Sequence, residues 1–171
     1  MTTEEALDFL RRNSPLPPDQ ELTDELAFQY DEVRKFFLRN PDPRSIPLLL
    51  NSYGDGSGFG MYQLIEDVIA QFSKEEVLPH LRSAIESPHD AVRFWSIQMA
   101  PTFIDESLVG PLLLNLEHPS PFVRSAAADA LSFVNEQFVR DALHQRNRIE
   151  TDPTAQLAIQ SALADLSRRS R

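Results

Sequence analysis

The sequence predicts an all-α protein, a short α-solenoid made of antiparallel helix pairs. Two observations lead to this prediction. The stretch from Pro79 to Val134 contains one pattern twice, with Pro79 and Pro111 32 residues apart and Arg93 and Arg124 31 residues apart. Apolar residues also recur every three or four positions along most of the chain, which is the spacing of a half-buried helix. A fixed period over helix-length segments is typical of helical repeat arrays, in which neighbouring pairs stack to bury their apolar faces.

The composition is that of a folded, acidic protein. Hydrophobic residues make up 42% of the 171 residues, and the formal net charge is −10. Most of this charge lies in residues 1–120, which carry 20 acidic and 9 basic side chains. An acidic surface repels phosphate backbones and attracts basic proteins, so we expect a basic protein partner and no nucleic acid. Because the chain has no cysteine, disulfides, thiolate catalysis and cysteine-ligated zinc are excluded.

The sequence gives no sign of export or of membrane insertion. Residues Met1–Ala6 are acidic and lack the basic and then apolar order of a signal peptide. No apolar run approaches the roughly 18 residues that a membrane-spanning helix needs. We therefore expect a cytoplasmic protein without a membrane partner.

We expect residues 1–171 to form a single domain. Residues 1–44 should form N-terminal capping helices, residues 45–166 about four repeat units, and residues 167–171 a polar, frayed tail. The last repeat unit should end in a helix from Pro153 to about Leu166.

Two helices are predicted before the repeats. The first runs from Thr3 to about Arg12 and ends before the proline-rich segment Ser14–Pro18, because proline breaks a helix interior. The second spans about Asp19 to Arg39, with Arg34 on its outer side. Its buried stripe comprises Leu22, Leu26, Tyr30, Val33 and Phe37.

Three prolines, Pro47, Pro79 and Pro111, are predicted to mark the starts of the first helices of successive repeats. Proline is well tolerated in a first helical turn, where its missing N–H is no loss. The second helices, of which the first should run from Met61 to Phe72, share core positions 31 residues apart. These positions are Met61, Ile65, Val68, Ile69 and Phe72, then Val92, Ser96, Met99, Ala100 and Phe103, and then Val123, Ala127, Ala130, Leu131 and Val134.

The repeated segments resemble a known family. Asp90–Arg93 with Ser96 and Ala100, and Val123–Arg124 with Ala127 and Leu131, resemble the second helix of HEAT repeats, and Pro79 and Pro111 resemble the proline of the first helix. The resemblance covers Ser45–Leu166 and departs at Tyr62 and Gln156, which replace the arginine. It implies a right-handed solenoid whose second helices line a concave face. It says little about function, because such arrays serve many roles.

The resemblance also implies which residues face that concave surface. Outside the core register, Leu64, Trp95 and Ala126 form one row, and Asp67, Gln98 and Asp129 form another, with Phe94 and Phe133 nearby. Trp95, the only tryptophan, either packs into the array or anchors a partner, as tryptophan often does at interfaces. We expect Arg93 and Arg124 to be structural, because repeated positions usually serve the repeat.

Four of the five glycines lie in the segment Tyr53–Gly60, which must be a loop. It lacks the spacing of a dinucleotide-binding fingerprint and the lysine of a phosphate-binding loop. Asp55, Ser57, Gly60 and Glu66 partly fit a calcium-binding loop, but Phe59 occupies a ligand position. An ordinary connection and a loop that contacts a partner are the other interpretations, because Tyr53, Phe59 and Tyr62 are of residue types common at interfaces.

The sequence contains candidate partner-binding residues but no catalytic, cofactor-binding or metal-binding ones. The four histidines have no metal-ligand spacing, and no nucleophile motif such as Gly-x-Ser-x-Gly occurs. The candidate contact residues are Tyr53, Asp55, Phe59, Tyr62, Asp67, Phe94, Trp95, Gln98, Asp129 and Phe133.

These features favour a non-enzymatic scaffold for protein interactions that needs no cofactor. Its size, acidity and repeat architecture resemble those of immunity proteins, which bind and neutralise a basic toxin or nuclease domain. One alternative is an enzyme on the same scaffold, such as a tetrapyrrole (bilin) lyase or a DNA glycosylase, although the acidity disfavours the glycosylase. A general assembly adaptor is the other alternative.

Overall fold

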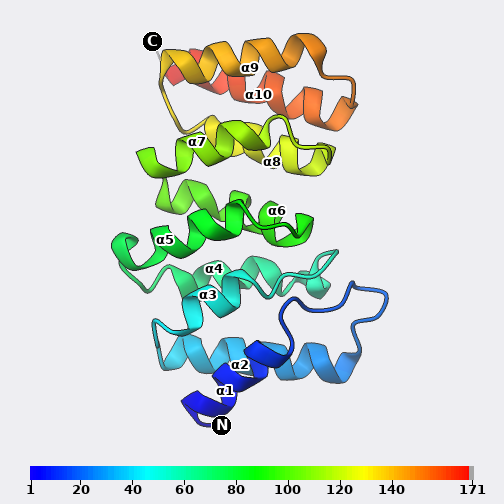
Figure 1. Ribbon diagram of the computed structural model, residues 1–171, viewed down its shortest axis with the longest axis vertical. Coiled ribbons are helices and arrows are strands. Elements are labelled where there is room, and N and C mark those ends of the chain that lie inside the picture. Colours follow the sequence, from blue (N-terminus) through cyan, green and yellow to red (C-terminus); the bar gives the residue numbers. More distant parts are fainter. Residues whose placement is uncertain (170–171) are drawn as a thin grey trace. The chain divides into compact units, whose positions relative to one another are not determined.

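The computed structural model describes residues 1–169 (Figure 1), and within them it contains ten α-helices, three short 3-10 helices and no strand. The predicted all-α fold is confirmed. The chain forms two compact units, Met1–Trp95 and Ser96–Arg171, and the boundary between these ranges falls within the sequence of helix α6 (Asp90–Met99). Among the described helices, none has both the length and the apolar character required to cross a membrane.

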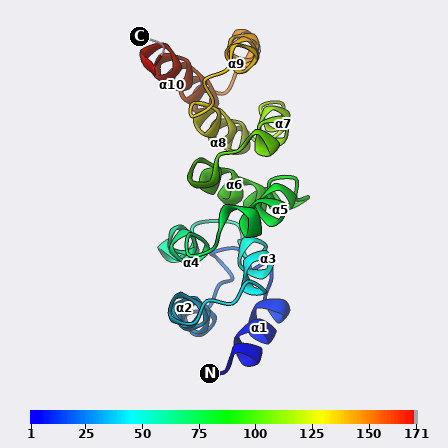
Figure 2. The ribbon, with the colours of Figure 1, turned by 90° about the vertical axis from the view of Figure 1, so that its left-hand side faces the viewer.

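The first unit consists of two layers of helices. Helices α1, α3 and α5 form one layer, in which α3 packs against both α1 and α5, while α2 and α4 pack against each other in the second layer (Figure 2). This is the stacking expected of helical repeats. The elements are α1 Thr3–Arg12, α2 Asp24–Arg39, α3 Ser45–Leu50, the 3-10 helices Gly58–Gly60 and Tyr62–Leu64, α4 Ile65–Ile69 and α5 Lys74–Ile85.

The second unit has the same plan, and its α-helices are all longer than α3 and α4. Helix α8 packs against α7 and α10, and α10 also packs against α9 (Figure 2). The tail predicted to be frayed, residues 167–171, is helical through Arg169, and residues 170–171 lie outside the described part of the chain. The elements after α6 are the 3-10 helix Ala100–Phe103, α7 Glu106–Asn115, α8 Pro121–Leu131, α9 Gln137–Ile149 and α10 Pro153–Arg169.

The prediction that prolines mark helix starts is wrong for Pro79 and Pro111. Both lie inside their helices, because polar side chains begin these helices earlier. Ser73 caps α5 and forms a reciprocal capping box with Glu76, and the Asp105 carboxylate caps α7 by accepting from the N–H of Ser107 at 3.0 Å. A side-chain oxygen that satisfies a free N–H fixes the start of a helix more strongly than a proline does.

Side-chain caps also set the starts of the first two helices. The first helix starts at Thr3 as predicted, because Thr2 caps α1 and forms a capping box with Glu5. Helix α2 begins at Asp24 rather than at Asp19, because the Thr23 hydroxyl accepts from the N–H of Leu26 at 3.2 Å. The residues between α1 and α2 are therefore free to pair with another part of the first unit.

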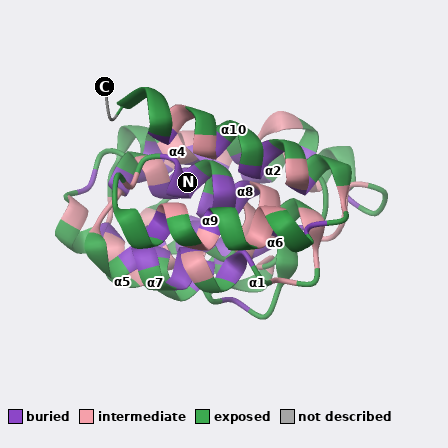
Figure 3. Ribbon diagram, turned by 90° about the horizontal axis from the view of Figure 1, so that it is seen from above, coloured by how far each residue is buried: buried purple, intermediate pink, exposed green. Residues whose placement is uncertain are grey.

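The core follows the predicted register closely. All of the core positions predicted in the second helices are buried, except Met61 and Val134, which are half-buried. Buried and exposed residues alternate along α9 and α10, as expected for helices with one buried and one exposed face (Figure 3).

Three predictions about exposure and helix length need correction. Ala126 was expected on a surface row but is buried, because α8 packs against helices on two sides. Arg34 was expected to face outward but is 7% exposed and pairs with Asp31 at 2.8 Å. The helix expected from Met61 to Phe72 is shorter, because the Tyr62–Leu64 stretch is a 3-10 turn and α4 spans only Ile65–Ile69.

Candidate functional site

The glycine-rich loop of the first unit is held in place by the segment between α1 and α2. The N–H of Leu16 donates to the carbonyl of Ser52, and the N–H of Asp19 donates to that of Asp55, both at 2.9 Å. The Asp19 carboxylate accepts from the N–H groups of Ser57 at 2.9 Å and Gly58 at 2.8 Å. These hydrogen bonds fix the loop in one conformation. The main contact comes from Asp19, almost 40 residues earlier in the chain.

The glycine at position 54 is explained by this pairing of two backbones. A Cβ atom on Gly54 would lie 2.3 Å from the carbonyl oxygen of Leu16 and 2.6 Å from that of Pro17. Real Cβ atoms do not approach backbone oxygens so closely. The need for glycine here is thus steric, and no ligand is required to account for it.

The side chains of Tyr53, Tyr62 and Trp95 form an aromatic cluster that is bonded to the loop. Tyr53 stacks on Trp95 with ring centroids 6.0 Å apart, and Tyr62 meets Trp95 edge-on at 5.6 Å. The Tyr62 hydroxyl accepts from the N–H of Gly54 at 2.9 Å, and the Trp95 indole N–H donates to the carbonyl of Gly56 at 3.1 Å. Tyr62, which replaces the repeat's arginine, thus bonds the loop that precedes its own helix.

Tyr53 and Tyr62 are not available to a partner in this structure. Each is 1% exposed, and burial raises the pKa of both hydroxyls. They were predicted as contact residues because tyrosine is common at interfaces, but here their rings fill the core and support the loop. Trp95 is half-buried, with part of its ring system committed to the same cluster.

Phe59 has a different environment from the buried tyrosines. Its side chain is 60% exposed, and its backbone is left-handed, with φ 52° and ψ 32°. This conformation costs a non-glycine residue about 1–2 kcal/mol. Strained residues of this kind cluster at functional sites, where the surrounding structure holds them. The loop therefore displays an aromatic ring on a hydrogen-bonded backbone, with the exposed carboxylate of Asp55 on the same loop.

The remaining predicted contact residues are at least partly accessible. Asp67, Gln98 and Asp129 are exposed, Phe94 is half-buried, and Phe133 is 49% exposed. Desolvation by the surrounding protein raises the pKa of Asp129, and the nearby carboxylate of Asp165 adds to this effect.

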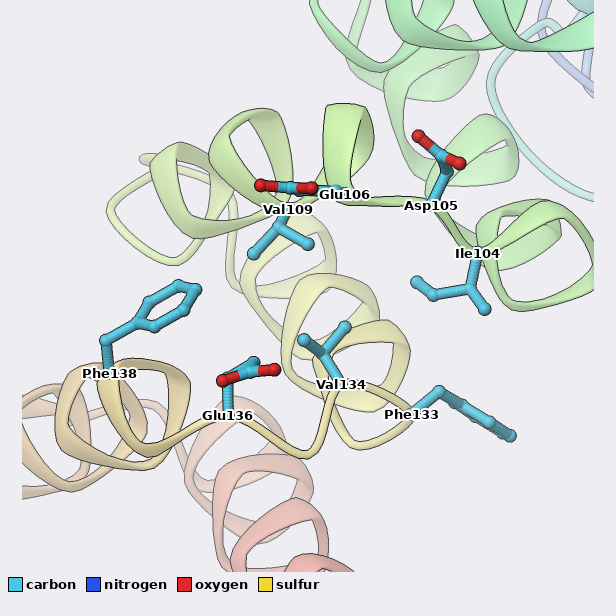
Figure 4. Close-up of a pocket in the computed structure, with 8 residues that line it drawn as sticks. All are labelled: Ile104, Asp105, Glu106, Val109, Phe133, Val134, Glu136 and Phe138. Carbon is cyan, nitrogen blue, oxygen red and sulfur yellow. The ribbon is translucent and has the colours of Figure 1, made fainter. Parts of the chain in front are cut away.

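The second unit contains a groove with a volume of about 500 Å³ (Figure 4). It lies where the connections that lead into α7 and α9 come together. In Figure 4 the ring of Phe138 and the side chain of Val109 face each other across the gap, with Glu136 and Val134 along the α9 side. The described residues that line the groove are Ile104, Asp105, Glu106, Val109, Phe133, Val134, Glu136 and Phe138.

The lining of the groove combines apolar surface with negative charge. Among the described lining residues, five are apolar, three are acidic and none is basic. Phe133 and Phe138 remain 49% and 53% exposed, which is unusual for two phenylalanines in one small surface. Such a lining suits a ligand that is apolar and cationic.

Of the described lining residues, only Phe133 is among the contact residues predicted from the sequence. The signal that could have revealed the groove is the pair Phe133 and Phe138, of which Phe133 lies in the connection between α8 and α9 and Phe138 in the first turn of α9. Aromatic residues within a connection and directly after it are poorly placed for burial in either helix pair. The contribution of Ile104–Glu106 could not be inferred, because it depends on how two connections meet in space.

The repeated arginines bond the turns that precede their own helices, consistent with the expected structural role. The Arg93 guanidinium donates to the carbonyl of Ser87 at 2.7 Å. The Arg124 guanidinium donates to the carbonyls of His118 and Pro119, both at 2.8 Å, and to the Glu150 carboxylate. Each arginine therefore closes the turn of its helix pair.

The calcium interpretation of the glycine loop gains no support from its geometry. Within residues 1–169, no group of three or more acidic or histidine side chains is arranged to hold a metal ion. The Ser57 hydroxyl, one of the proposed ligands, lies 3.3 Å from the Asp19 carboxylate. The hydrogen bonds of this loop therefore account for its shape.

Comparison with known protein families supports the helical-repeat fold. A search of curated proteins finds no significant match to the chain. A family model for HEAT repeats matches residues 78–164, just over half of the 171 residues. This range contains α6–α8, whose register and repeated arginines carry the resemblance seen in the sequence. The chain belongs to the HEAT-repeat family.

Proposed function

We propose that this protein is a non-enzymatic scaffold for a basic protein partner, and more specifically an immunity or inhibitor protein that neutralises a toxin domain. Helical repeat arrays provide extended surfaces for binding other proteins. The observation that carries the proposal is the groove of the second unit, in which exposed phenylalanines stand beside carboxylates and no described basic residue. Apolar and acidic groups in one concavity complement a basic surface with apolar anchors.

The charge of the first unit supports a basic partner. Residues 1–95 carry 17 acidic and 9 basic side chains, so this unit holds most of the net charge of −10. A field of this sign accelerates the approach of a basic protein, while well-packed apolar contacts set how long it stays bound. Asp55, Phe59 and Asp67 are exposed side chains in this unit that could supply both kinds of contact.

The lyase alternative is less well supported. It would need an open, ligand-sized apolar surface at Trp95. Tyr53 and Tyr62 pack against this ring, and the indole N–H is bonded to the loop. These contacts occupy surface that a tetrapyrrole would use.

The proposal predicts that a gene for a basic toxin domain lies beside the gene for this chain, and that domain is the partner to test. Co-expression of the chain should protect cells from the toxin, and the two purified proteins should bind with an association rate that falls steeply as salt is added. Failure of both protection and binding would refute the inhibitor proposal. Binding without protection would support the scaffold and remove the inhibitor role.

A pair of charge reversals tests whether the predicted row of Asp67, Gln98 and Asp129 contacts the partner. Asp67→Lys should slow association with the toxin domain several-fold. Glu21→Lys makes the same change in charge at another exposed position of the first unit and serves as the matched control. Equal association rates for the two variants would remove Asp67 from the proposed contact surface.

A further inference from the structure

One side chain of the protein already rests on an aromatic ring that lines the groove. Arg169, in the last turn of α10, places its guanidinium carbon 4.7 Å from the ring centroid of Phe133. Its Nη1 donates to the backbone carbonyl of Ser132 at 3.0 Å. An aromatic face and an adjacent carbonyl oxygen together recognise a guanidinium, because the cation attracts the ring and the N–H groups need acceptors.

The position of Arg169 makes this contact easy to exchange. The residue is exposed and lies in the terminal turn of its helix, where helices open most readily. An exposed cation–π contact changes an equilibrium constant only about two- to fivefold. A second guanidinium held by additional contacts in the groove would therefore displace Arg169.

The rest of the groove offers those additional contacts. Ile104, Val109 and Val134 provide aliphatic surface and Phe138 an aromatic ring, while Glu106 and Glu136 provide negative charge. The volume of about 500 Å³ lies within the range of sites that hold a small ligand, so it fits a short segment rather than a folded domain. Arg169 is not among the described residues that line the groove, and its link to the groove is its contact with the Phe133 ring.

We infer that the groove binds a segment of the partner that carries an arginine next to an aliphatic or aromatic residue, and that Arg169 occupies the guanidinium position until that segment displaces it. The inference rests on the proposed function and names the chemistry by which the partner is recognised. Arg169 acts as an internal competitor, so it lowers the affinity of the groove for weakly basic proteins. Only a partner that has both the arginine and the neighbouring apolar residue displaces it.

The test uses a fluorescein-labelled synthetic peptide of alternating leucine and arginine, measured by fluorescence anisotropy with the full chain. Matched peptides replace each arginine with lysine or with neutral citrulline. The arginine peptide should bind about two- to fivefold more tightly than the lysine peptide, because arginine stacks on the Phe133 ring and bonds a carbonyl at once. The citrulline peptide should bind most weakly. Equal affinity for the arginine and lysine peptides would overturn the guanidinium position.

Two variants of Phe133 test the ring itself. Phe133→Leu removes the aromatic face and should weaken the arginine peptide about two- to fivefold, whereas Phe133→Tyr keeps the ring and should retain the affinity. Phe122→Leu, at a 64% exposed phenylalanine in the same unit outside the described lining, is the control and should have no effect. An equal loss in Phe133→Leu and Phe122→Leu would overturn the inference, as would an equal loss in Phe133→Leu and Phe133→Tyr.

A matched pair of arginine substitutions tests the competition. Arg169→Gln and Arg168→Gln remove the same charge, but Arg168 is paired with Asp165 on α10 instead of resting on Phe133. Arg169→Gln should raise the affinity for the arginine peptide about two- to fivefold more than Arg168→Gln does. Equal gains would mean that charge alone matters and would overturn the role of Arg169.

The two proposals fail in distinguishable ways. If the toxin domain binds the chain but Phe133→Leu and Arg169→Gln change neither peptide nor toxin binding, the groove is refuted and the scaffold stands. If the peptide results are as expected but the toxin domain neither binds nor is neutralised, the site stands and the inhibitor role is refuted.

Discussion

The Arg124 guanidinium in α8 donates two hydrogen bonds of 2.7 Å each to the Glu150 carboxylate at the end of α9. The two side chains are 9% and 0% exposed. Arg146 adds a further contact to Oε2 of the same carboxylate at 3.0 Å. The N–H groups of Thr151 and Asp152 donate to its Oε1. One buried carboxylate therefore ties the helix pair α7–α8 to α9 and to the turn that begins α10.

Removal of the Glu150 charge should strongly destabilise the second unit. Glu150→Gln leaves the buried guanidinium of Arg124 without its counter-charge, and breaking a buried ion pair in this way costs about 3–5 kcal/mol. The free energy of unfolding, measured by urea denaturation, should fall by that amount. Glu117→Gln removes a 63% exposed partner of Arg146 and should cost less than about 1 kcal/mol. Similar losses in the two variants would contradict the central role of Glu150.

The same carboxylate predicts a dependence of stability on pH. The hydrogen bond from Arg124 is the main cause that lowers the pKa of Glu150 from its ordinary 4.5 to about 2. The folded state therefore holds this group ionised more strongly than the unfolded state does. The stabilisation is fully present above the ordinary pKa and is lost as the pH falls towards 2.

Comparison of the wild type with Glu150→Gln isolates this effect, because the other carboxylates are common to both proteins. The difference in their free energies of unfolding should be largest at pH 6 and should shrink steadily from about pH 5 to pH 2. Denaturation curves at pH 6, 4 and 3 would measure it. A difference that stays constant over this range would mean that Glu150 has an ordinary pKa in the folded protein.

The helical layout could be predicted from the sequence because it depends on local periodicity. Core positions such as Val92 and Val123 recur at a fixed spacing, and burial follows that spacing. Helix starts were harder to predict, since Ser73 and Asp105 cap α5 and α7 six residues before Pro79 and Pro111. The motif from Ser73 to Glu76 was nevertheless a readable capping signal.

The functional surfaces could be predicted only in part, because they depend on contacts between distant residues. Asp19 holds the glycine loop from almost 40 residues away, and no local pattern connects the two. Tyrosine is both a core and an interface residue, so the sequence could not tell that Tyr53 is buried while Phe59 is exposed. The groove required the knowledge that two connections meet, which only the three-dimensional structure provides.

Two glycine substitutions should have opposite effects on stability. Gly54→Ala forces a Cβ atom against the backbone oxygens of Leu16 and Pro17, so the paired segments must separate, and we expect a loss of about 2–3 kcal/mol. Gly110→Ala adds a Cβ atom in open space within α7, where alanine favours the helix by about 1 kcal/mol. Thermal unfolding should show a lower Tm for the first variant and a higher Tm for the second. A raised Tm in Gly54→Ala would mean that the two segments are not closely paired.

Ser96 offers a simple route to a more stable protein. Its side chain is fully buried, and its hydroxyl has no hydrogen-bond partner. A buried polar group without a partner costs about 1–3 kcal/mol, so Ser96→Ala should raise the free energy of unfolding by about 1 kcal/mol. Ser132→Ala is the matched control, because the Ser132 hydroxyl donates to the carbonyl of Asp129 at 2.7 Å and its loss should destabilise. A destabilised Ser96→Ala variant would indicate that the hydroxyl is bonded in solution.

Replacement of Phe59 by asparagine should stabilise the fold and weaken partner binding. Asparagine adopts the left-handed conformation more readily than phenylalanine, so Phe59→Asn should relieve backbone strain and raise the free energy of unfolding by about 0.5–1 kcal/mol. Phe28→Asn is the control, since Phe28 is similarly exposed but lies in the regular helix α2, where asparagine is a poorer helix former and should destabilise slightly. If Phe59 contacts the basic partner, the stabilised variant should also dissociate from that partner several-fold faster than the wild type. A stabilised variant with unchanged dissociation would assign the strain of this loop to a role other than partner binding, and a destabilised variant would show that the phenylalanine ring itself stabilises the fold.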